Sequence, residues 1–186
     1  MNYFSLMYLG LFSFLISILS FFNIIYSYYF NLYLNIDSYI YSLILSLIFG
    51  CIFFLKKKDE FRISIYHKII TVMSGYIILP LIISVPFYFS IYNLSFLDSY
   101  FESISGFTST GFTIFDNIKQ IDTSLILWRS TSQWIGGLYF LFSLLLLIDI
   151  FDENLKKSLT NYFSFDSSEI LKQSIKIILI YLSLTI

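Results

Sequence analysis

The chain has 186 residues, of which 58% are hydrophobic and 12% are charged, and its mean hydropathy is +0.80. Soluble domains contain about 45–50% apolar and about 25% charged residues, so this composition indicates a membrane protein. A net charge of −1 excludes nucleic-acid binding by bulk electrostatic attraction. With Cys51 as the one cysteine and His67 as the one histidine, no disulfide, metal cluster or catalytic triad can be recognised. We therefore expect neither enzyme activity nor a cofactor.

Two apolar stretches open the chain. Residues 1–26 are almost entirely apolar and long enough to cross a hydrocarbon core of roughly 30 Å as a helix. A short connection with tyrosines and asparagines, residues 28–37, resembles an interfacial turn with aromatic anchors. A second span follows over residues 39–55 and ends at the basic run Lys56 to Lys58. Residues 1–60 are thus predicted to form a leading pair of transmembrane helices.

A third span, residues 69–91, contains both prolines of the chain, Pro80 and Pro86. Each proline removes a backbone donor, so kinks are expected, with neighbouring helices satisfying the freed carbonyls. The next segment, residues 93–107, is too short and too polar to cross a bilayer. Within it, Ser95 and Asp98 have the spacing of a capping box, which predicts a helix of about ten residues ending at Gly106.

A small, hydroxyl-rich stretch, Ser105 to Thr113, separates this short helix from a fourth span over residues 125–150. A mixed-charge connection, residues 152–169, leads into a fifth apolar stretch, residues 170–186, which ends without a polar exit. We expect the chain to be cut off inside this helix. The predicted fold is an all-α polytopic membrane protein. It has one membrane–pore-loop–membrane unit over residues 61–151 and the start of a second unit over residues 152–186.

Nine of the eleven basic residues fall in two segments, Lys56 to Lys68 and Lys156 to Lys176. By the positive-inside rule both segments are cytoplasmic, which also places the N-terminus inside the cell. An even number of crossings separates the two segments, so the assignment is consistent with the predicted spans. The short helix then enters the membrane from the outside and returns there.

The order of span, short re-entrant helix, small hydroxyl-glycine loop and span is that of a cation-channel pore unit. The negative end of the short helix's dipole points at the loop. Backbone carbonyls of such a loop can replace the water shell of a cation, and Thr108, Ser109 and Thr110 are the candidate ligands. Gly111 can adopt a positive φ and aim a carbonyl inward. On spacing alone, an ordinary loop between two helices is an equal alternative.

Four landmarks resemble the Trk/Ktr/HKT potassium transporter superfamily, most closely the bacterial Trk membrane subunit. The sequence from Ser105 to Gly111 resembles the first selectivity filter of this superfamily, and Leu127 to Leu138 resembles the start of the following helix. Val85 to Ser90 resembles the end of the preceding helix, and Tyr181 to Thr185 the opening of the next unit. They occur in the same order as in the superfamily.

The resemblance implies a bacterial inner-membrane protein in which two leading helices precede four pore units around one pore. It further implies a homodimer that binds a cytoplasmic nucleotide-binding regulatory subunit. Potassium would be held by Thr108, Ser109, Thr110, Gly111 and Phe112 of this unit. In two places the chain departs from the superfamily: Tyr139 stands where a small glycine is usual, and Phe112 where a smaller residue is common. These departures bear on close helix packing and on the outer mouth of the pore.

Several further residues carry two interpretations. Glu102 could concentrate cations at the mouth, but pairing with Arg129 or solvation at the outer surface is favoured. The pair Gly136 and Gly137 is expected to allow close helix contact rather than to form a hinge. The run from Lys56 to Lys58 is a topology signal, with membrane-lipid contact as a weaker alternative. Cys51, His67 and Asp149 are expected to have no functional role.

The sequence therefore predicts potassium transport, with selectivity from filter carbonyls and with potassium as the transported ion. A single unit cannot surround an ion, so further units or further copies are required. The rival hypothesis is a non-transporting truncated remnant or a membrane-embedded interaction subunit.

Overall fold

The computed structural model describes residues 3–55, 65–117, 121–151 and 170–185. Its helices are α1 (Tyr3–Tyr29), α2 (Ile36–Leu55), α3 (Ile65–Tyr88), α4 (Phe96–Phe107), α5 (Thr123–Phe151) and α7 (Ile170–Thr185), with a short 3-10 turn η1 (Tyr33–Asn35) before α2. These described residues contain no β-strand, so the predicted all-α class is confirmed. Lys56 to Lys58, Lys156 and Lys157, used to predict topology, lie outside the described residues.

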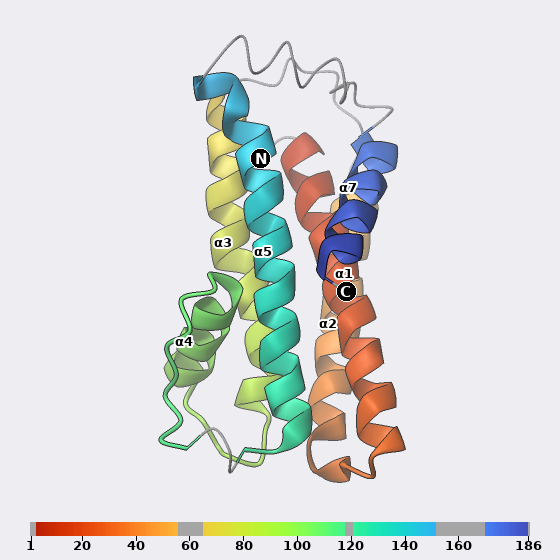
Figure 1. The fold of residues 1–186 in the computed structure, drawn as a ribbon, viewed down its shortest axis with the longest axis vertical. Helices are drawn as coiled ribbons and strands as arrows, with labels where there is room; N and C mark the ends of the chain where they lie inside the picture. The colour runs from red at the N-terminus through yellow and green to blue at the C-terminus, as the bar shows by residue number, and fades with distance from the viewer. Residues whose placement is uncertain (1–2, 56–64, 118–120, 152–169, 186) are drawn as a thin grey trace.

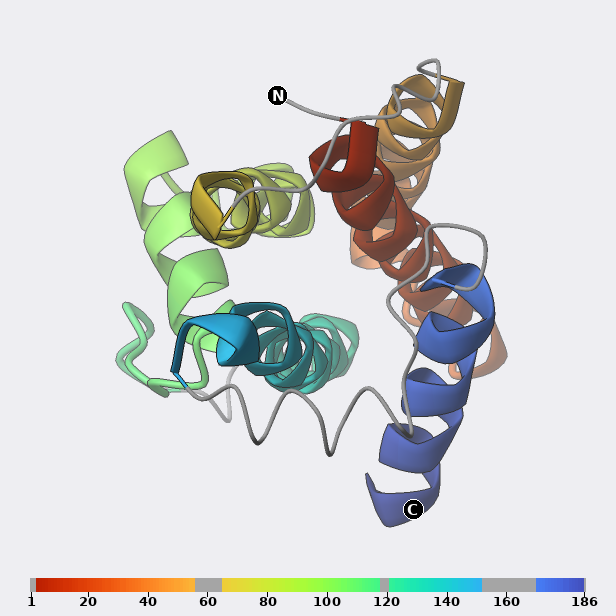
Figure 2. The ribbon, with the colours of Figure 1, turned by 90° about the horizontal axis from the view of Figure 1, so that it is seen from above.

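The long helices run side by side along the long axis of the molecule, and α4 is a short helix against the lower halves of α3 and α5 (Figure 1). Seen from above, α4 lies at the edge of the bundle away from α2 and α7 (Figure 2). The end of α2, the beginning of α3, the end of α5 and the beginning of α7 all lie at one end of the bundle (Figure 1). This arrangement agrees with the even number of crossings expected between the two basic segments.

Among the described residues, three helical segments are long and apolar enough to cross a membrane: Met7–Tyr29, Tyr33–Phe53 and Tyr66–Tyr88. The chain is therefore a multi-pass membrane protein. The predicted boundaries need small corrections, because α1 continues to Tyr29 and α3 ends at Tyr88 rather than at residue 91. Asn31, with φ of +56°, turns the chain sharply and leaves a connection shorter than the one expected.

Both prolines lie inside α3. The carbonyl three residues before each proline accepts a hydrogen bond from another helix. Tyr100 of α4 donates its hydroxyl to the Ile77 carbonyl (3.1 Å), and Trp128 of α5 donates its indole N–H to the Ile83 carbonyl (3.0 Å). A proline weakens the helical hydrogen bonds beside it, so these contacts replace part of what is lost. They also attach both neighbouring helices to α3.

Two groups of contacts join the leading pair, α1 and α2, to the other helices. At the end of the bundle where α1 turns into α2, the Asn35 amide donates to the Asp122 carboxylate (2.7 Å), and the Tyr39 hydroxyl lies 2.9 Å from that of Ser124 at the start of α5. Deeper in the bundle, rings from α1, α3, α4 and α5 form one aromatic cluster, whose members are Tyr8, Phe12, Tyr76, Phe107, Tyr139 and Phe142. This cluster lies next to the end of α4, so the core of the bundle supports the predicted filter.

Candidate functional site

The start of α4 is fixed by a local cap. The Ser95 hydroxyl accepts a hydrogen bond from the Asp98 backbone N–H at 3.2 Å and donates one to the Asp98 carboxylate at 2.6 Å. A side-chain acceptor at this position satisfies a helix N–H that has no intrahelical partner. The predicted helix start at Ser95 is thereby confirmed, although the Asp98 carboxylate accepts from the Ser95 hydroxyl rather than from its backbone N–H as in a full capping box, and α4 has twelve residues rather than about ten.

The end of α4 differs from the prediction, which placed the helix terminus at Gly106. The helix continues to Phe107, and Thr108 is the C-terminal cap, with φ of −86°. Gly106 is instead a buried helical residue whose missing side chain admits α5. A Cβ atom there would lie 2.4 Å from the Ser132 hydroxyl oxygen. The glycine therefore favours a close contact between two helices, and a larger residue there would force the Ser132 hydroxyl to rotate away; no local sequence signal reveals this contact.

The backbone after α4 bends through two left-handed residues. Ser109 has φ of +56° and Gly111 has φ of +82°, so the positive φ predicted for Gly111 is confirmed. The carbonyl oxygens of Thr108, Ser109 and Thr110 accept no hydrogen bond within the described part of the chain. All three residues are exposed. The C-terminal, negative end of the α4 dipole lies at this same position, so three unbonded carbonyls stand at a site that favours a cation.

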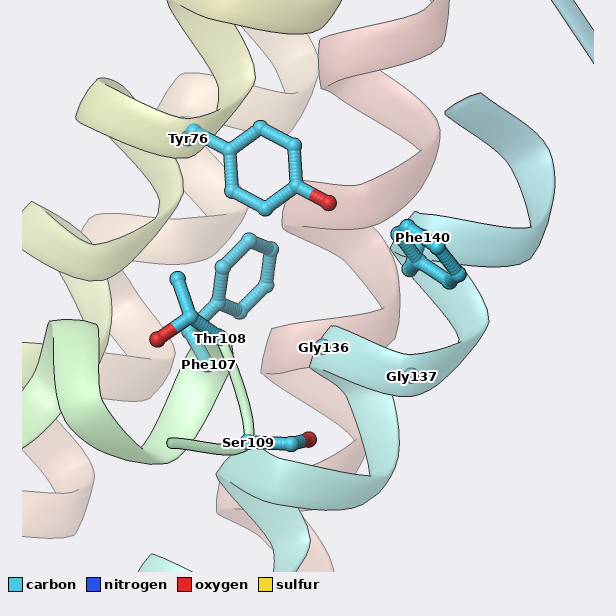
Figure 3. A pocket seen from close by; sticks show the side chains of 7 residues that line it. All are labelled: Tyr76, Phe107, Thr108, Ser109, Gly136, Gly137 and Phe140. Carbon is cyan, nitrogen blue, oxygen red and sulfur yellow. The ribbon is translucent and has the colours of Figure 1, made fainter. Parts of the chain in front are cut away.

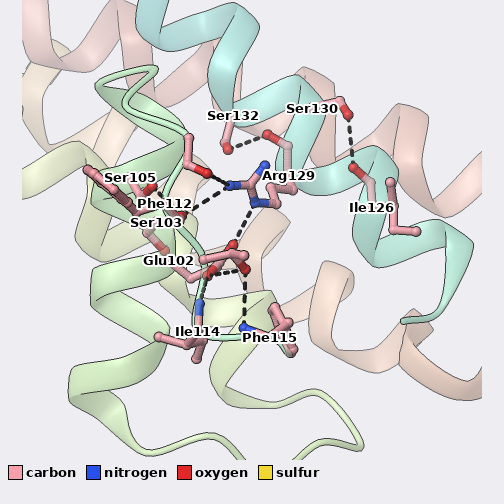
Figure 4. Close-up of polar contacts among 12 residues, drawn as sticks. Glu102, Ser103, Ser105, Phe112, Ile114, Phe115, Ile126, Arg129, Ser130 and Ser132 are labelled. Atoms are coloured by element: carbon pink, nitrogen blue, oxygen red, sulfur yellow. Dashed lines mark hydrogen bonds and ion pairs between the residues drawn. The ribbon is translucent and has the colours of Figure 1, made fainter. Parts of the chain in front are cut away.

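The next two carbonyls have partners within the chain. The Arg129 guanidinium donates from one nitrogen, Nη2, to the carbonyl of Gly111 (3.2 Å) and to that of Phe112 (3.1 Å) (Figure 4). The Ser105 hydroxyl also donates to the Phe112 carbonyl. Gly111 therefore turns its carbonyl toward Arg129. The Phe112 side chain is 70% exposed.

Glu102 is fully buried and uses both of its carboxylate oxygens. Oε1 accepts from Arg129 Nε at 2.5 Å, and Oε2 accepts from the Thr113 hydroxyl and the Ile114 backbone N–H, each at 3.1 Å (Figure 4). The predicted pairing with Arg129 is confirmed, and solvation at the outer surface is wrong. Burial of a charge is costly unless it is paired and hydrogen-bonded, and this carboxylate is both.

Gly136 allows α5 to touch the end of α4, as predicted for the glycine pair. A Cβ atom at Gly136 would lie 1.8 Å from the Phe107 carbonyl oxygen, so only glycine fits this contact. Beside it lies a pocket of about 460 Å³, lined by Tyr76, Phe107, Thr108, Ser109, Gly136, Gly137 and Phe140 (Figure 3). The pocket brings the glycine pair of α5 next to the first two residues of the predicted filter.

Sequence reasoning missed three residues at this site. Ser105 and Thr113 hold the loop through the hydrogen bonds to Phe112 and Glu102, and neither was given a role beyond its place in the motif. Gly75, on α3, admits the Tyr139 side chain. Two signals for Gly75 were available in the sequence. Gly75 is a lone glycine in an apolar span, and Tyr139 is a bulky residue where a small one is usual. Among the described residues, no group of three or more His, Cys, Asp or Glu side chains could hold a metal ion.

The fold and the site together define a helical membrane protein with a short helix, α4, whose C-terminal end presents carbonyls that accept no hydrogen bond within the described residues. Comparison with known sequences agrees with this class. The TrkH family, described as cation transport proteins, matches residues 35–185, and the chain belongs to this family.

Individual relatives match shorter stretches. An uncharacterized cation transporter of Methanocaldococcus jannaschii is 35% identical over 75 residues, 40% of this chain and 16% of the relative. The Trk system potassium uptake protein TrkI of Halomonas elongata is 38% identical over 66 residues, 36% of this chain and 12% of the relative. The potassium uptake protein TrkG of Escherichia coli is 30% identical over 90 residues, 48% of this chain and 19% of the relative. The chain thus spans less than a fifth of the length of these relatives.

Proposed function

We propose that the chain forms the leading helices and the first pore unit of a Trk-type potassium uptake protein. In this proposal the carbonyls of Thr108, Ser109 and Thr110 bind the dehydrated ion. Gly111 and Phe112, predicted as ligands too, form the outer end of the filter, where Arg129 holds their carbonyls. Further pore units complete the ring around the ion, because one loop contacts it from one side only.

The observation that supports this proposal most strongly is the division of the loop into two parts. Three successive carbonyls are free of hydrogen bonds within the described residues, and the next two are bonded to Arg129. Unbonded carbonyls at membrane depth are costly unless they line a water-filled path or bind a ligand. A row of backbone carbonyls is the kind of group that replaces the hydration shell of a potassium ion.

The proposal that potassium is the transported ion rests on the relatives. Those in Halomonas elongata and Escherichia coli are named potassium uptake proteins, and both match this chain over a part of their length. We place the protein in the bacterial inner membrane, as the family resemblance implies, with a cytoplasmic N-terminus, as the distribution of basic residues predicts. A homodimer and a cytoplasmic nucleotide-binding regulatory subunit complete the proposed assembly. We also propose that the chain has three parts. Residues 1–60 form the leading helix pair, residues 61–151 the first pore unit, and residues 152–186 the cytoplasmic connection and the start of the second unit.

A graft tests the proposed function. The matching stretch of Escherichia coli TrkG is replaced with the corresponding residues of this chain. Rubidium uptake and growth at low potassium are then measured in a strain that lacks its own potassium uptake. The proposal predicts uptake by the graft and reduced uptake when Gly111→Ala is introduced. A graft that is inserted in the membrane but takes up no rubidium would contradict the proposal and favour a non-transporting remnant.

A matched control separates failure of the loop from failure of packing. A second graft keeps the helices of this chain but carries the loop of TrkG in place of residues 108–112. If this control transports and the first graft does not, the loop of this chain is unable to serve as a filter. If neither graft accumulates in the membrane, the graft is rebuilt from residue 95 to residue 139 alone, and uptake by this shorter graft decides between the two outcomes.

A further inference from the structure

Tyr139 is fully buried near the middle of α5 and contacts three other helices. Its ring centroid lies 4.9 Å from that of Phe12 on α1, 5.0 Å from that of Tyr76 on α3, and 5.3 Å from that of Phe107 on α4. Aromatic pairs at these separations stabilise beyond the area they bury. Tyr139 is thus the ring where the first leading helix α1, the short helix α4 and the two spans of the pore unit, α3 and α5, meet.

The hydroxyl of Tyr139 anchors this ring to the backbone of α3. It lies 2.9 Å from the Val72 carbonyl oxygen and 3.3 Å from the Thr71 carbonyl oxygen. Gly75, one turn further along α3, makes the approach possible. A Cβ atom at Gly75 would lie 1.8 Å from the Tyr139 hydroxyl oxygen, 2.4 Å from Cζ and 2.9 Å from Cε2. The tyrosine and the glycine are therefore complementary in size.

Phe107 connects this pair to the filter, because it directly precedes Thr108. Its ring lies against Tyr76 and Tyr139, and its carbonyl lies against Gly136. Figure 3 shows the Phe107 ring between Tyr76 and the first loop residues. The last residue of α4 is therefore held through its side chain by the aromatic cluster and through its backbone by α5.

From this geometry we infer that Tyr139 is a positioning residue, which sets the place of the first filter carbonyls through Phe107, and that Gly75 exists to admit it. The inference rests on the proposed function only in treating the loop as a filter. The contacts themselves predict a measurable coupling between the Tyr139 side chain and the loop in the chain as it stands.

The test uses the 186-residue chain in detergent, with Thr108→Cys as a reporter in a Cys51→Ser background. The rate at which a positively charged methanethiosulfonate reagent modifies the reporter is measured beside the thermal unfolding midpoint. We expect Tyr139→Leu to change the modification rate several-fold, because the support behind Phe107 is lost. Tyr139→Phe keeps the ring and is expected to keep the rate while lowering the unfolding midpoint, since only the hydroxyl bond to α3 is removed.

Tyr39→Leu is the matched control for a purely structural effect. Tyr39 is equally buried and its hydroxyl pairs with Ser124, but its ring contacts Trp128 rather than α4. This control is expected to lower the unfolding midpoint and leave the reporter rate unchanged. The inference is wrong if Tyr139→Leu behaves in the same way.

The glycine gives a second, independent check through a double-mutant cycle. Gly75→Ala alone is expected to lower the unfolding midpoint strongly and change the reporter rate. Combined with Tyr139→Leu it should add little, because the shorter side chain leaves room for the new methyl group. Combined with Tyr139→Phe the damage should remain, because Cζ is still too close. Additive effects in both combinations would overturn the inference, and neither measurement depends on potassium transport.

Discussion

Arg129 and Glu102 hold the two sides of one loop together. The carboxylate of Glu102 binds the Arg129 side chain through one oxygen and the returning loop at Thr113 and Ile114 through the other. Arg129 binds the same loop two residues earlier, at Gly111 and Phe112. The ion pair therefore fixes the loop directly after the three unbonded carbonyls.

Removal of either charge is expected to damage the fold. Arg129→Gln should lower the free energy of unfolding by about 3–5 kcal/mol, since the buried Glu102 carboxylate is left unpaired. Glu102→Gln should lower it by less, because the Arg129 side chain is 14% exposed and keeps its bonds to the loop carbonyls. Exchange of the two residues should restore part of this loss. Thermal unfolding in detergent provides the measurement, and independent, additive losses in the single and double variants would show that the two side chains do not interact.

Gly111→Ala tests the loop backbone without a steric effect. Among the described residues, no atom lies within 4 Å of a Cβ placed at Gly111, so only the positive φ opposes the substitution there. The left-handed conformation costs about 1–2 kcal/mol for a residue with a Cβ. We expect the variant to reduce rubidium uptake by the TrkG graft. Thr110→Ala, which keeps the backbone, should retain most of the uptake; equal losses would mean that the hydroxyl rather than the carbonyl matters.

The two glycines of α5 should differ sharply in tolerance. Gly136→Ala places a methyl group against a backbone carbonyl that cannot move without moving α4, and overpacking of this kind costs about 1–3 kcal/mol or more. A Cβ atom at Gly137 would lie 2.6 Å from the Tyr181 hydroxyl oxygen, which is the end of a side chain that can rotate away. The unfolding midpoint should therefore fall much further for the first variant, and equal shifts would contradict the close contact at Phe107.

Two buried asparagines give a contrast of partnered and unpartnered amides. Asn23 and Asn35 are each 1% exposed. The Asn35 amide donates to Asp122 and accepts from the Ile91 N–H, whereas both polar atoms of the Asn23 amide lack a partner within the described chain. Asn35→Leu should lower stability by about 1–3 kcal/mol, and Asn23→Leu should raise it, because an unpaired buried amide is removed. A loss of stability in both variants would show that Asn23 has a hydrogen-bonding partner.

The parts of the site that sequence predicts are those with local causes. The start of α4 follows from Ser95 and Asp98, three residues apart, and the positive φ of Gly111 follows from the absence of a side chain. The role of Gly106 was misjudged, because its reason lies on α5, at Ser132. Tyr139, a bulky residue where a small one is usual, put close helix packing in doubt, and its sequence neighbours do not show how it is accommodated.

The residue that accommodates Tyr139 lies on α3. Gly75 makes room for the Tyr139 ring, so the bulky residue strengthens the contact between α3 and α5 rather than loosening it. In the same way, Arg129 is eighteen residues from Gly111, and the hydrogen bond between them exists only once α5 packs against the loop. Contacts of this kind are set by the packing of helices that are distant in sequence.

The most direct test of the filter compares two peptide bonds in the TrkG graft. An ester linkage weakens the preceding carbonyl as an acceptor and removes one N–H, and neither the Gly111 nor the Thr113 N–H donates a hydrogen bond within the described residues. One graft carries an ester between Thr110 and Gly111, and the other between Phe112 and Thr113. Rubidium uptake should fall in the first graft and stay near the unmodified rate in the second. Unchanged uptake in the first graft, or a greater loss in the second, would contradict ion binding by the carbonyls that precede Gly111.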